Sequence, residues 1–368
     1  MEKVNIGIVG VGDISGIYLK NLHGLFKELR VVGVCDLIRE KAERAKAQYN
    51  IPKIYDTMYD LIADPEVDIV LNLTRPNEHY GVSRAALEGG KHVYSEKPLA
   101  ARIEDGRALV ALAEEKGLML GGAPDTFLGA GIQTCRRIID SGFIGDIIGA
   151  SAAMICHGHE SWHPDPEFYY GAGGGPMLDM GPYYITALIN LLGEAKAVTG
   201  ITRTSFRERT ITSAPKFGKI IPVEAFTHVT GMIEFTSGAV ANITTTFDVH
   251  YDKQAHFEVY GSEGTLAVPD PNIFGGPIMI YRPEEKRWLE MPLTFGYSEN
   301  SRGLGLADMA KAITTDRTPR ASYKQTLHVL EVMTAFERSS AKGAREDIIS
   351  HFERVAPMQS GGLPGILD

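Results

Sequence analysis

Cysteine is scarce in this chain, and so are long apolar runs. The three cysteines, Cys35, Cys135 and Cys156, do not have the spacing of a zinc site or a redox pair. So few cysteines fit a reducing compartment. No apolar run approaches the ~20 residues that a membrane-spanning helix needs, and the first residues lack the pattern of a signal peptide. We therefore expect a cytoplasmic protein with no membrane partner.

Positive charge is also in short supply. The chain has 37 lysines and arginines against 46 aspartates and glutamates, which gives a formal net charge of -9 at pH 7. This balance argues against nucleic acid as a partner, because binding a phosphate backbone requires a basic surface. The chain has 368 residues, of which 44% are hydrophobic and 23% charged, and this suits two globular domains.

The first third of the chain alternates short apolar runs with amphipathic stretches. The expected strands cover residues 4–9, 31–35, 67–73, 92–94 and 118–120. The expected helices between them include residues 37–49, 80–87 and 103–115. Strands that alternate with helices predict a parallel, doubly wound α/β sheet of the Rossmann type. We expect residues 1–122 to form this dinucleotide-binding domain.

After residue 122 the strands become longer and alternate in polarity. A helix over residues 130–141 precedes strands over residues 146–156, 225–235, 238–247, 256–260 and 265–268. Helices are expected again near residues 305–314 and 324–342. This pattern predicts, for residues 123–368, an α+β domain with a large, open and mainly antiparallel sheet. We expect this domain to bind the substrate and to mediate oligomerisation, with the active site where the two domains meet.

A glycine-rich turn follows the first expected strand. Gly10 would permit a tight turn, and Gly12 would let the backbone approach a pyrophosphate group. The helix that begins after this turn would direct free N–H groups at the phosphates. Ser15 occupies the place of the third glycine of such turns, and Gly16 comes one residue late. The turn alone is also compatible with an ordinary connection between a strand and a helix.

Asp36 strengthens the interpretation as a cofactor site. It ends the second expected strand, where an acidic residue accepts the ribose hydroxyls of NAD, although polar residues commonly end strands. A carboxylate at this position would repel the 2′-phosphate of NADP, whereas Arg39 could offset this repulsion. We expect NAD as the cofactor, with NADP possible.

Two further motifs are more specific. Glu96-Lys97-Pro98 follows the fourth expected strand, and residues 173–183 contain three glycines followed by PMLDMGPY. Together with the first glycines they resemble the Gfo/Idh/MocA oxidoreductases, over essentially the whole chain. Residues 74–79 are similar to the T-P-N-x-x-H stretch of this family, with Arg75 inserted. In the family this stretch lines the nicotinamide side of the cofactor.

The resemblance implies a function and a set of residues. It implies a Rossmann domain followed by a domain with a large open sheet, and hydride transfer between NAD(P) and a hydroxyl carbon of a sugar, glycoside or polyol. It also implies a cis bond between Lys97 and Pro98. The expected cofactor-binding residues are Gly10, Gly12, Asp13, Ile14, Asp36, Arg39, Thr74, Pro76, Asn77, His79, Glu96 and Lys97.

Alcohol oxidation requires a base for the hydroxyl proton while hydride leaves the carbon. Lys97 lies at the carboxyl end of a parallel strand, where such sheets bind ligands. The alternative is that Lys97 is an ordinary surface lysine before a helix. Asp179 and Tyr183 would share one face of a helix, and Asp179 could instead cap that helix. In the family the position of Tyr183 is most often histidine and serves as the acid/base. We expect Lys97, Asp179 and Tyr183 to be catalytic.

The loop over residues 157–170 is rich in histidine and aromatic residues. Aromatic rings stack on sugars and imidazoles bind hydroxyl groups. The expected substrate-binding residues are Lys97, Asp125, Trp162, His163, Tyr170, Asp179 and Tyr183. A structural loop or a subunit contact is an equal alternative. His157, His159 and His163 also have ligand-like spacing, but hydride transfer needs no metal and we expect none.

Two other functions fit the same fold. A redox-neutral enzyme would oxidise a sugar transiently with tightly held NAD, cleave it by elimination and return the hydride. A non-catalytic sugar or NAD sensor would keep only the cofactor fold, and a set of proton-transfer residues argues against it. One face of the open sheet requires a cover, so we expect a homodimer or homotetramer, as the resembling family commonly forms.

Overall fold

The computed structural model describes residues 3–250, 256–361, 365 and 367, and the chain divides into two compact units. The first unit comprises Met1–Gly129, Phe295–Leu327 and Val355–Asp368, and the second comprises Ala130–Thr294 and His328–Arg354. The sequence assigns residues 295–327 and 355–368 to the second domain, whereas here they pack with the first unit. The assignment of cofactor binding to residues 1–122 and of substrate binding to residues 123–368 stays a prediction.

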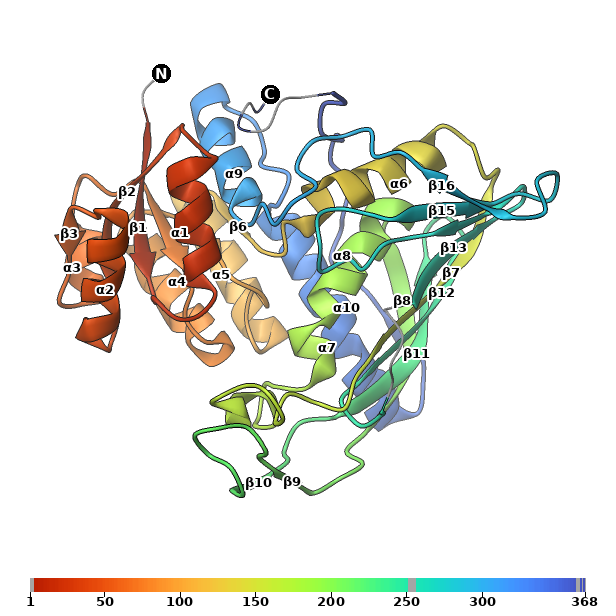
Figure 1. Ribbon diagram of the computed structural model, residues 1–368, viewed down its shortest axis with the longest axis horizontal. Coiled ribbons are helices and arrows are strands. Elements are labelled where there is room, and N and C mark those ends of the chain that lie inside the picture. Colours follow the sequence, from red (N-terminus) through yellow and green to blue (C-terminus); the bar gives the residue numbers. More distant parts are fainter. Residues whose placement is uncertain (1–2, 251–255, 362–364, 366, 368) are drawn as a thin grey trace. The chain divides into compact units, whose positions relative to one another are not determined.

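A six-stranded parallel sheet forms the centre of the first unit (Figure 1). In order across the sheet, the strands are β3 (Lys53–Ile54), β2 (Leu29–Cys35), β1 (Val4–Val9), β4 (Ile69–Asn72), β5 (His92–Ser95) and β6 (Leu120–Gly122). The connecting helices are α1 (Ser15–Gly24), α2 (Arg39–Tyr49), α3 (Met58–Ala63), α4 (His79–Glu88) and α5 (Ile103–Lys116). Ile6, Ile8 and Leu71 on the strands are fully buried. The predicted Rossmann-type sheet is confirmed.

The strand order of this sheet determines where a ligand can bind. The chain runs outward from β1 to β3, and then returns to place β4 on the other side of β1. In open parallel sheets the ligand lies at the carboxyl ends of the strands, at the point where the order reverses. That edge follows β1, β4 and β5, and the segments that leave it begin at Gly10, Leu73 and Glu96.

A late segment of the chain also belongs to the first unit. It contains α9 (Leu304–Thr315) and the beginning of α10 (Tyr323–Lys342). The side-chain amide of Asn21 in α1 donates to the carbonyl oxygens of Asn300 and Arg302, at 2.9 and 2.8 Å. These bonds join residues about 280 positions apart in sequence, so no local pattern predicts them.

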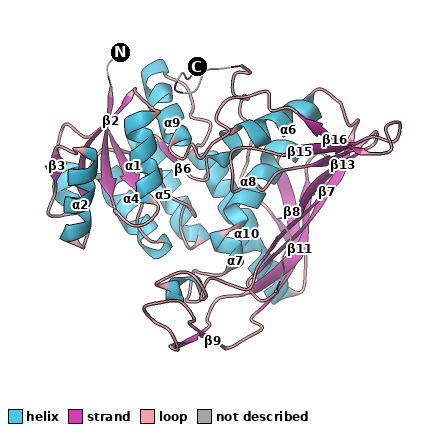
Figure 2. Ribbon diagram, in the orientation of Figure 1, coloured by secondary structure: helices cyan, strands magenta, loops and turns pink. Residues whose placement is uncertain are grey.

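A nine-stranded mixed sheet dominates the second unit (Figure 2). In order, the strands are β16 (Trp288–Met291), β15 (Ile278–Tyr281), β14 (Thr265–Ala267), β13 (His256–Gly261), β7 (Ile147–Ile155), β12 (Val240–Thr246), β11 (His228–Phe235), β8 (Ala195–Arg203) and β17 (Glu346–Asp347). The pair β7–β12 is parallel and the other neighbouring pairs are antiparallel. The predicted large and mainly antiparallel sheet is confirmed.

Helices cover one face of this sheet. α6 (Ala130–Asp140) and α8 (Gly181–Leu192) lie against it in Figure 2, and every residue of α8 is buried. The second half of α10 packs on β8, because the Ser339 hydroxyl accepts the Gly200 N–H at 3.0 Å. The short helix α7 (Pro176–Asp179) precedes α8, and a separate pair of strands, β9 (Glu208–Thr210) and β10 (Ile220–Pro222), lies apart from the large sheet.

Candidate functional site

The turn after β1 has the geometry that a dinucleotide needs. Gly10 has a φ of +93°, and a Cβ atom there would lie 2.8 Å from the carbonyl carbon and oxygen of Leu73. Only glycine fits, because both the dihedral angle and the contact exclude a side chain. A Cβ atom on Gly12 would meet nothing within 4 Å. The backbone at Gly12 is therefore open on the side where a pyrophosphate would approach.

The amino end of α1 is available to a phosphate group. No side chain caps this end among the residues that the structure describes. Ser15 is buried, and its hydroxyl donates to the carbonyl oxygen of Gly12 at 2.6 Å, so it fills the place of the third glycine without blocking the turn. Asp13 and Ile14 lie between these two residues. The backbone N–H groups of a helix end attract anions.

Asp36 lies directly after β2 and is fixed by the backbone. Its Oδ2 accepts the Val11 N–H at 2.6 Å and its Oδ1 accepts the Ile38 N–H at 2.8 Å. The first of these bonds holds the carboxylate against the glycine-rich turn. Each carboxylate oxygen keeps a further lone pair, so the group can also accept ribose hydroxyls.

Arg39, the first residue of α2, is already paired with acids. Its guanidinium forms ion pairs with Asp56 and, at 3.2 Å, with Glu43. These hydrogen bonds raise the pKa of Arg39 above its ordinary value, with the Asp56 bond contributing most. A 2′-phosphate on the cofactor would have to compete with two carboxylates for this side chain.

His79, the first residue of α4, joins two of the expected cofactor segments. Its Nδ1 lies 2.7 Å from the carbonyl oxygen of Pro98, and its Nε2 lies 3.0 Å from that of Thr74. Burial lowers the pKa of His79. Because both ring nitrogens face backbone oxygens, the ring positions the Thr74 loop and the Pro98 turn, and its cofactor contact stays a prediction. Pro76 and Asn77 lie in the short 3-10 helix Pro76–Glu78 of this loop.

The Glu96-Lys97-Pro98 turn follows β5, and its Lys97–Pro98 bond is cis, as the family resemblance predicts. Glu96 is buried, and its carboxylate accepts the Tyr18 hydroxyl at 2.7 Å and the Lys97 N–H at 3.1 Å. Burial, and then the charge of Glu96, raise the pKa of Tyr18. The Glu96 carboxylate therefore braces the turn, while Lys97 beside it remains partly exposed.

Asp125, a predicted substrate ligand, is bound by backbone groups of the first unit, and its substrate contact stays a prediction. It is fully buried, and its Oδ2 accepts the N–H groups of Gly303 and Gly305 at 2.8 and 3.0 Å. These groups belong to the amino end of α9, so Asp125 caps this helix from a distant part of the sequence. Burial raises the pKa of Asp125 to about 6, although the two backbone donors oppose this shift.

In the second unit, Asp179 and Tyr183 lie at a break between helices rather than in one helix. Asp179 is the last residue of α7, and α8 begins at Gly181. Met180 joins them with φ -108° and ψ -25°, so the shared helix face that the spacing predicts is only approximate. Asp179 is partly buried, and Tyr183 is buried.

The aromatic loop places its candidate residues very differently. Trp162 is 61% exposed, and its ring packs edge-on against the rings of His159 and His163. His163 is partly exposed, and its Nδ1 accepts the Asp165 N–H at 3.0 Å. Tyr170 is fully buried and donates to Glu160. Trp162 and His163 can thus meet a ligand, whereas Tyr170 is buried against Glu160 and its substrate contact stays a prediction.

A carboxylate–imidazole pair joins this loop to the catalytic motif. The Nε2 atom of His159 lies 3.2 Å from Oδ2 of Asp179, and both side chains are largely shielded from solvent. The sequence does not predict this pair, because the 20 positions between His159 and Asp179 carry no periodic signal. Among the described residues, no group of three or more histidine, cysteine or acidic side chains is placed to hold a metal ion.

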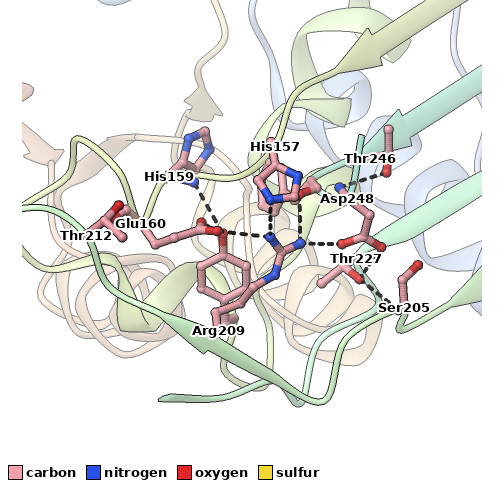
Figure 3. Close-up of polar contacts among 11 residues, drawn as sticks. His157, His159, Glu160, Ser205, Arg209, Thr212, Thr227, Thr246 and Asp248 are labelled. Atoms are coloured by element: carbon pink, nitrogen blue, oxygen red, sulfur yellow. Dashed lines mark hydrogen bonds and ion pairs between the residues drawn. The ribbon is translucent and has the colours of Figure 1, made fainter. Parts of the chain in front are cut away.

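A buried arginine holds the beginning of the same loop (Figure 3). Arg209 in β9 donates through Nη1 to Glu160 at 2.9 Å and through Nη2 to Asp248 at 2.5 Å. All three side chains are at most 8% exposed. Thr227 donates to the other oxygen of Asp248 at 2.7 Å. The sequence gives no sign of this network, since its members lie far apart along the chain.

Comparisons with known proteins place the chain among oxidoreductases. A family model described as "Oxidoreductase family, NAD-binding Rossmann fold" matches residues 4–122, and one described as "GFO/IDH/MocA C-terminal domain" matches residues 132–267. The chain is 31% identical to a 1,5-anhydro-D-fructose reductase of Ensifer adhaerens, over 71% of this chain and 74% of that protein. It is 24% identical to a levoglucosan dehydrogenase of Pseudarthrobacter phenanthrenivorans, over 95% and 99% of the two chains.

Solved structures share the fold over almost the whole chain. An NAD binding oxidoreductase from Klebsiella pneumoniae has a TM-score of 0.82 at 22% identity, covering 95% of this chain and 100% of that chain. A levoglucosan dehydrogenase in complex with NADH and levoglucosan has a TM-score of 0.80 at 22% identity, with the same coverage. Among the described residues, no helix is long and apolar enough to cross a membrane.

Proposed function

Because the chain belongs to the Gfo/Idh/MocA family of oxidoreductases, we propose that it transfers a hydride between NAD and a hydroxyl carbon of a sugar, glycoside or polyol. The observation that carries the proposal is the arrangement at the carboxyl edge of the parallel sheet. β1, β4 and β5 are neighbours there, and the Gly10 turn, the Thr74 loop and Lys97 leave this one edge together. Asp36, directly after β2 and bonded to the Val11 N–H, would complete a dinucleotide site.

The glycine-rich turn and Asp36 fit a dinucleotide. The side chains of the protein would then bind the substrate and transfer its hydroxyl proton. Bound NAD would accept or return the hydride. Lys97, whose turn is braced by Glu96, would polarise the reacting oxygen and stabilise negative charge on it as the proton leaves. Asp179 and Tyr183 complete the proposed catalytic set, and the sequence motif nominates Tyr183 for the proton transfer. The exposed ring of Trp162, and His163 next to it, would contact the sugar.

The substrate class follows from the relatives and from the nature of these side chains. Relatives are named for levoglucosan, 1,5-anhydro-D-fructose and myo-inositol, which are ring compounds with several hydroxyl groups. The test is a screen of free sugars, glycosides and inositols with NAD and with NADP, recorded by the absorbance of reduced nicotinamide. A screen in which no compound reduces either cofactor would oppose the proposal.

NAD should bind more tightly than NADP. The Asp36 carboxylate is held against the glycine-rich turn, where it would meet the ribose, and Arg39 is already paired with Asp56 and Glu43. We expect a preference for NAD of at least about tenfold by titration calorimetry, which corresponds to ~1.4 kcal/mol. Asp36→Ala should narrow the gap by removing the repulsion of a 2′-phosphate. Tighter binding of NADP to the unaltered protein would contradict this prediction and implicate Arg39.

The face of the large sheet that carries the exposed apolar residues should pack against a second copy of the chain. Ile201, Met232 and Val240 on this face are exposed, and Asn242 lies between Met232 and Ser151 in the register of the strands. We propose a homodimer or homotetramer. Light scattering should give at least twice the 40.2 kDa of the chain.

A bulky charge on this face should dissociate the oligomer. Asn242→Arg adds one at the middle of the face, and it should shift the protein to a monomer at micromolar concentration. The matched control is Gln48→Arg on the exposed side of α2 in the first unit. A stable monomer before any substitution would overturn the proposal.

The proposal of a cytoplasmic location rests on the three cysteines, all of them free.

A further inference from the structure

A histidine lies beside the segment that contains Asp179 and Tyr183. His159 comes from the loop after β7, 20 positions before Asp179. Its Nε2 atom lies 3.2 Å from Oδ2 of Asp179. A carboxylate cannot donate, so in the neutral imidazole this contact requires the proton on Nε2 and leaves the lone pair on Nδ1. Within the described part of the chain, no group forms a hydrogen bond with Nδ1 of His159.

The surroundings of His159 keep its ring in one orientation. Phe247 and Tyr169 pack against it at centroid distances of 4.6 and 4.3 Å, and Trp162 meets it edge-on at 5.2 Å. The ring is thus confined on several sides by aromatic groups, and Trp162 is the exposed member of the set. An imidazole held this way loses little freedom when it meets a substrate, which favours proton transfer.

The backbone of His159 is fixed by the buried network below it. The His159 N–H donates to the hydroxyl of Tyr170 at 3.2 Å, and this hydroxyl donates to Glu160. Glu160 in turn accepts from Arg209 (Figure 3). The ring of His159 is in direct contact with the Asp179 carboxylate, and Glu160, whose charge is balanced by Arg209, is linked to the His159 backbone through Tyr170. The other titratable neighbours are Tyr169, Tyr170 and Cys156. Burial, and then the charges of Asp179 and Glu160, raise the pKa of Cys156.

We propose that His159, oriented by Asp179, accepts the proton of the substrate hydroxyl in place of Tyr183. The inference rests on the proposed function and refines it. The O–H bond of the alcohol breaks and its proton moves to Nδ1 of His159, while the hydride of the same carbon passes to NAD. The products are the carbonyl compound, NADH and an imidazolium that releases its proton to water. Asp179 stabilises the imidazolium, and Tyr183 contributes a hydrogen bond.

The two candidate bases are separated by their pH profiles. His159→Gln should lower kcat/KM by ~100-fold, the lower end of what general base catalysis contributes. It should also abolish the fall of kcat/KM on the acid side, where an imidazole becomes protonated. Tyr183→Phe should keep that fall and lose less activity. The matched control is His250→Gln, an exposed histidine that stacks on His157 at 3.6 Å and takes no part in the proposed site.

A second measurement needs no substrate. Nitrogen NMR of histidine side chains in the apo protein, assigned by comparison with His159→Gln, should show His159 with its proton on Nε2. Asp179→Asn should change that signal. A proton on Nδ1, or an unchanged acid limb in His159→Gln, would overturn the inference. If the Nε2 signal is present but no sugar reduces NAD, the proposed function fails while the pairing of His159 with Asp179 stands.

Discussion

Lys97→Ala should reduce turnover by at least ~100-fold, because it removes the positive charge proposed to polarise the reacting oxygen. The affinity for NAD should change little, since the proposed phosphate site at Gly12 and the proposed ribose site at Asp36 follow other strands. The measurement is kcat with the best sugar of the screen, together with NAD titration by calorimetry. Such a split between turnover and cofactor affinity identifies a group that acts on the reacting atoms.

The control for this substitution is Lys116→Ala at the exposed end of α5. It removes a charge of the same sign from the same unit and should leave both quantities unchanged. A Lys97→Ala protein with nearly full kcat would contradict the proposed role. A large loss of NAD affinity with an unchanged kcat would instead make Lys97 a cofactor ligand alone.

Arg209→Met should lower the free energy of unfolding by ~3–5 kcal/mol, the range seen when one partner of a buried ion pair is removed. The substitution keeps an apolar stem but leaves Glu160 and Asp248 buried without a counter-charge. Urea denaturation measures this loss. Arg207→Met is the matched control, because Arg207 is exposed and such surface changes stay within about 0.5 kcal/mol.

A second variant separates charge from packing. Adding Glu160→Gln to Arg209→Met removes one uncompensated carboxylate while keeping the shape of the side chain, and it should recover part of the lost stability. If the double variant is less stable than Arg209→Met alone, the contacts of Glu160 with Tyr170 matter more than its charge. If Arg209→Met is as stable as the unaltered protein, the network does not hold the loop.

The sequence predicts the bounds of most strands of the first sheet closely and misplaces the last one. β1, β2 and β5 begin or end within two residues of their predicted bounds. The last strand of the first sheet is predicted at residues 118–120, whereas β6 covers Leu120–Gly122. A Cβ atom on Gly121 would lie 2.3 Å from the carbonyl oxygen of Ala321. Glycine is needed there for the close approach of a distant segment, which no local pattern reveals.

Motifs in the candidate site were easier to predict than side-chain roles. The glycine turn and Asp36 are recognised from short stretches of sequence, and the cis Lys97–Pro98 bond is implied by the family resemblance. Asp125 and Tyr170 were predicted to contact substrate, yet their partners lie at Gly303 and Glu160, and both side chains are buried. His159 was missed as a partner of Asp179 for the same reason. Residue type alone does not show which polar groups are already satisfied within the fold.

The proposed net transfer of hydride from sugar to NAD is tested most directly by the yield of NADH over many turnovers of one sugar. A dehydrogenase that releases its product forms one NADH for each molecule of sugar oxidised. We predict that NADH accumulates in proportion to the oxidised sugar, and that Lys97→Ala abolishes the accumulation. Cleavage of a glycoside with no net NADH would contradict the account, because it would mean that the hydride returns to the substrate within each cycle.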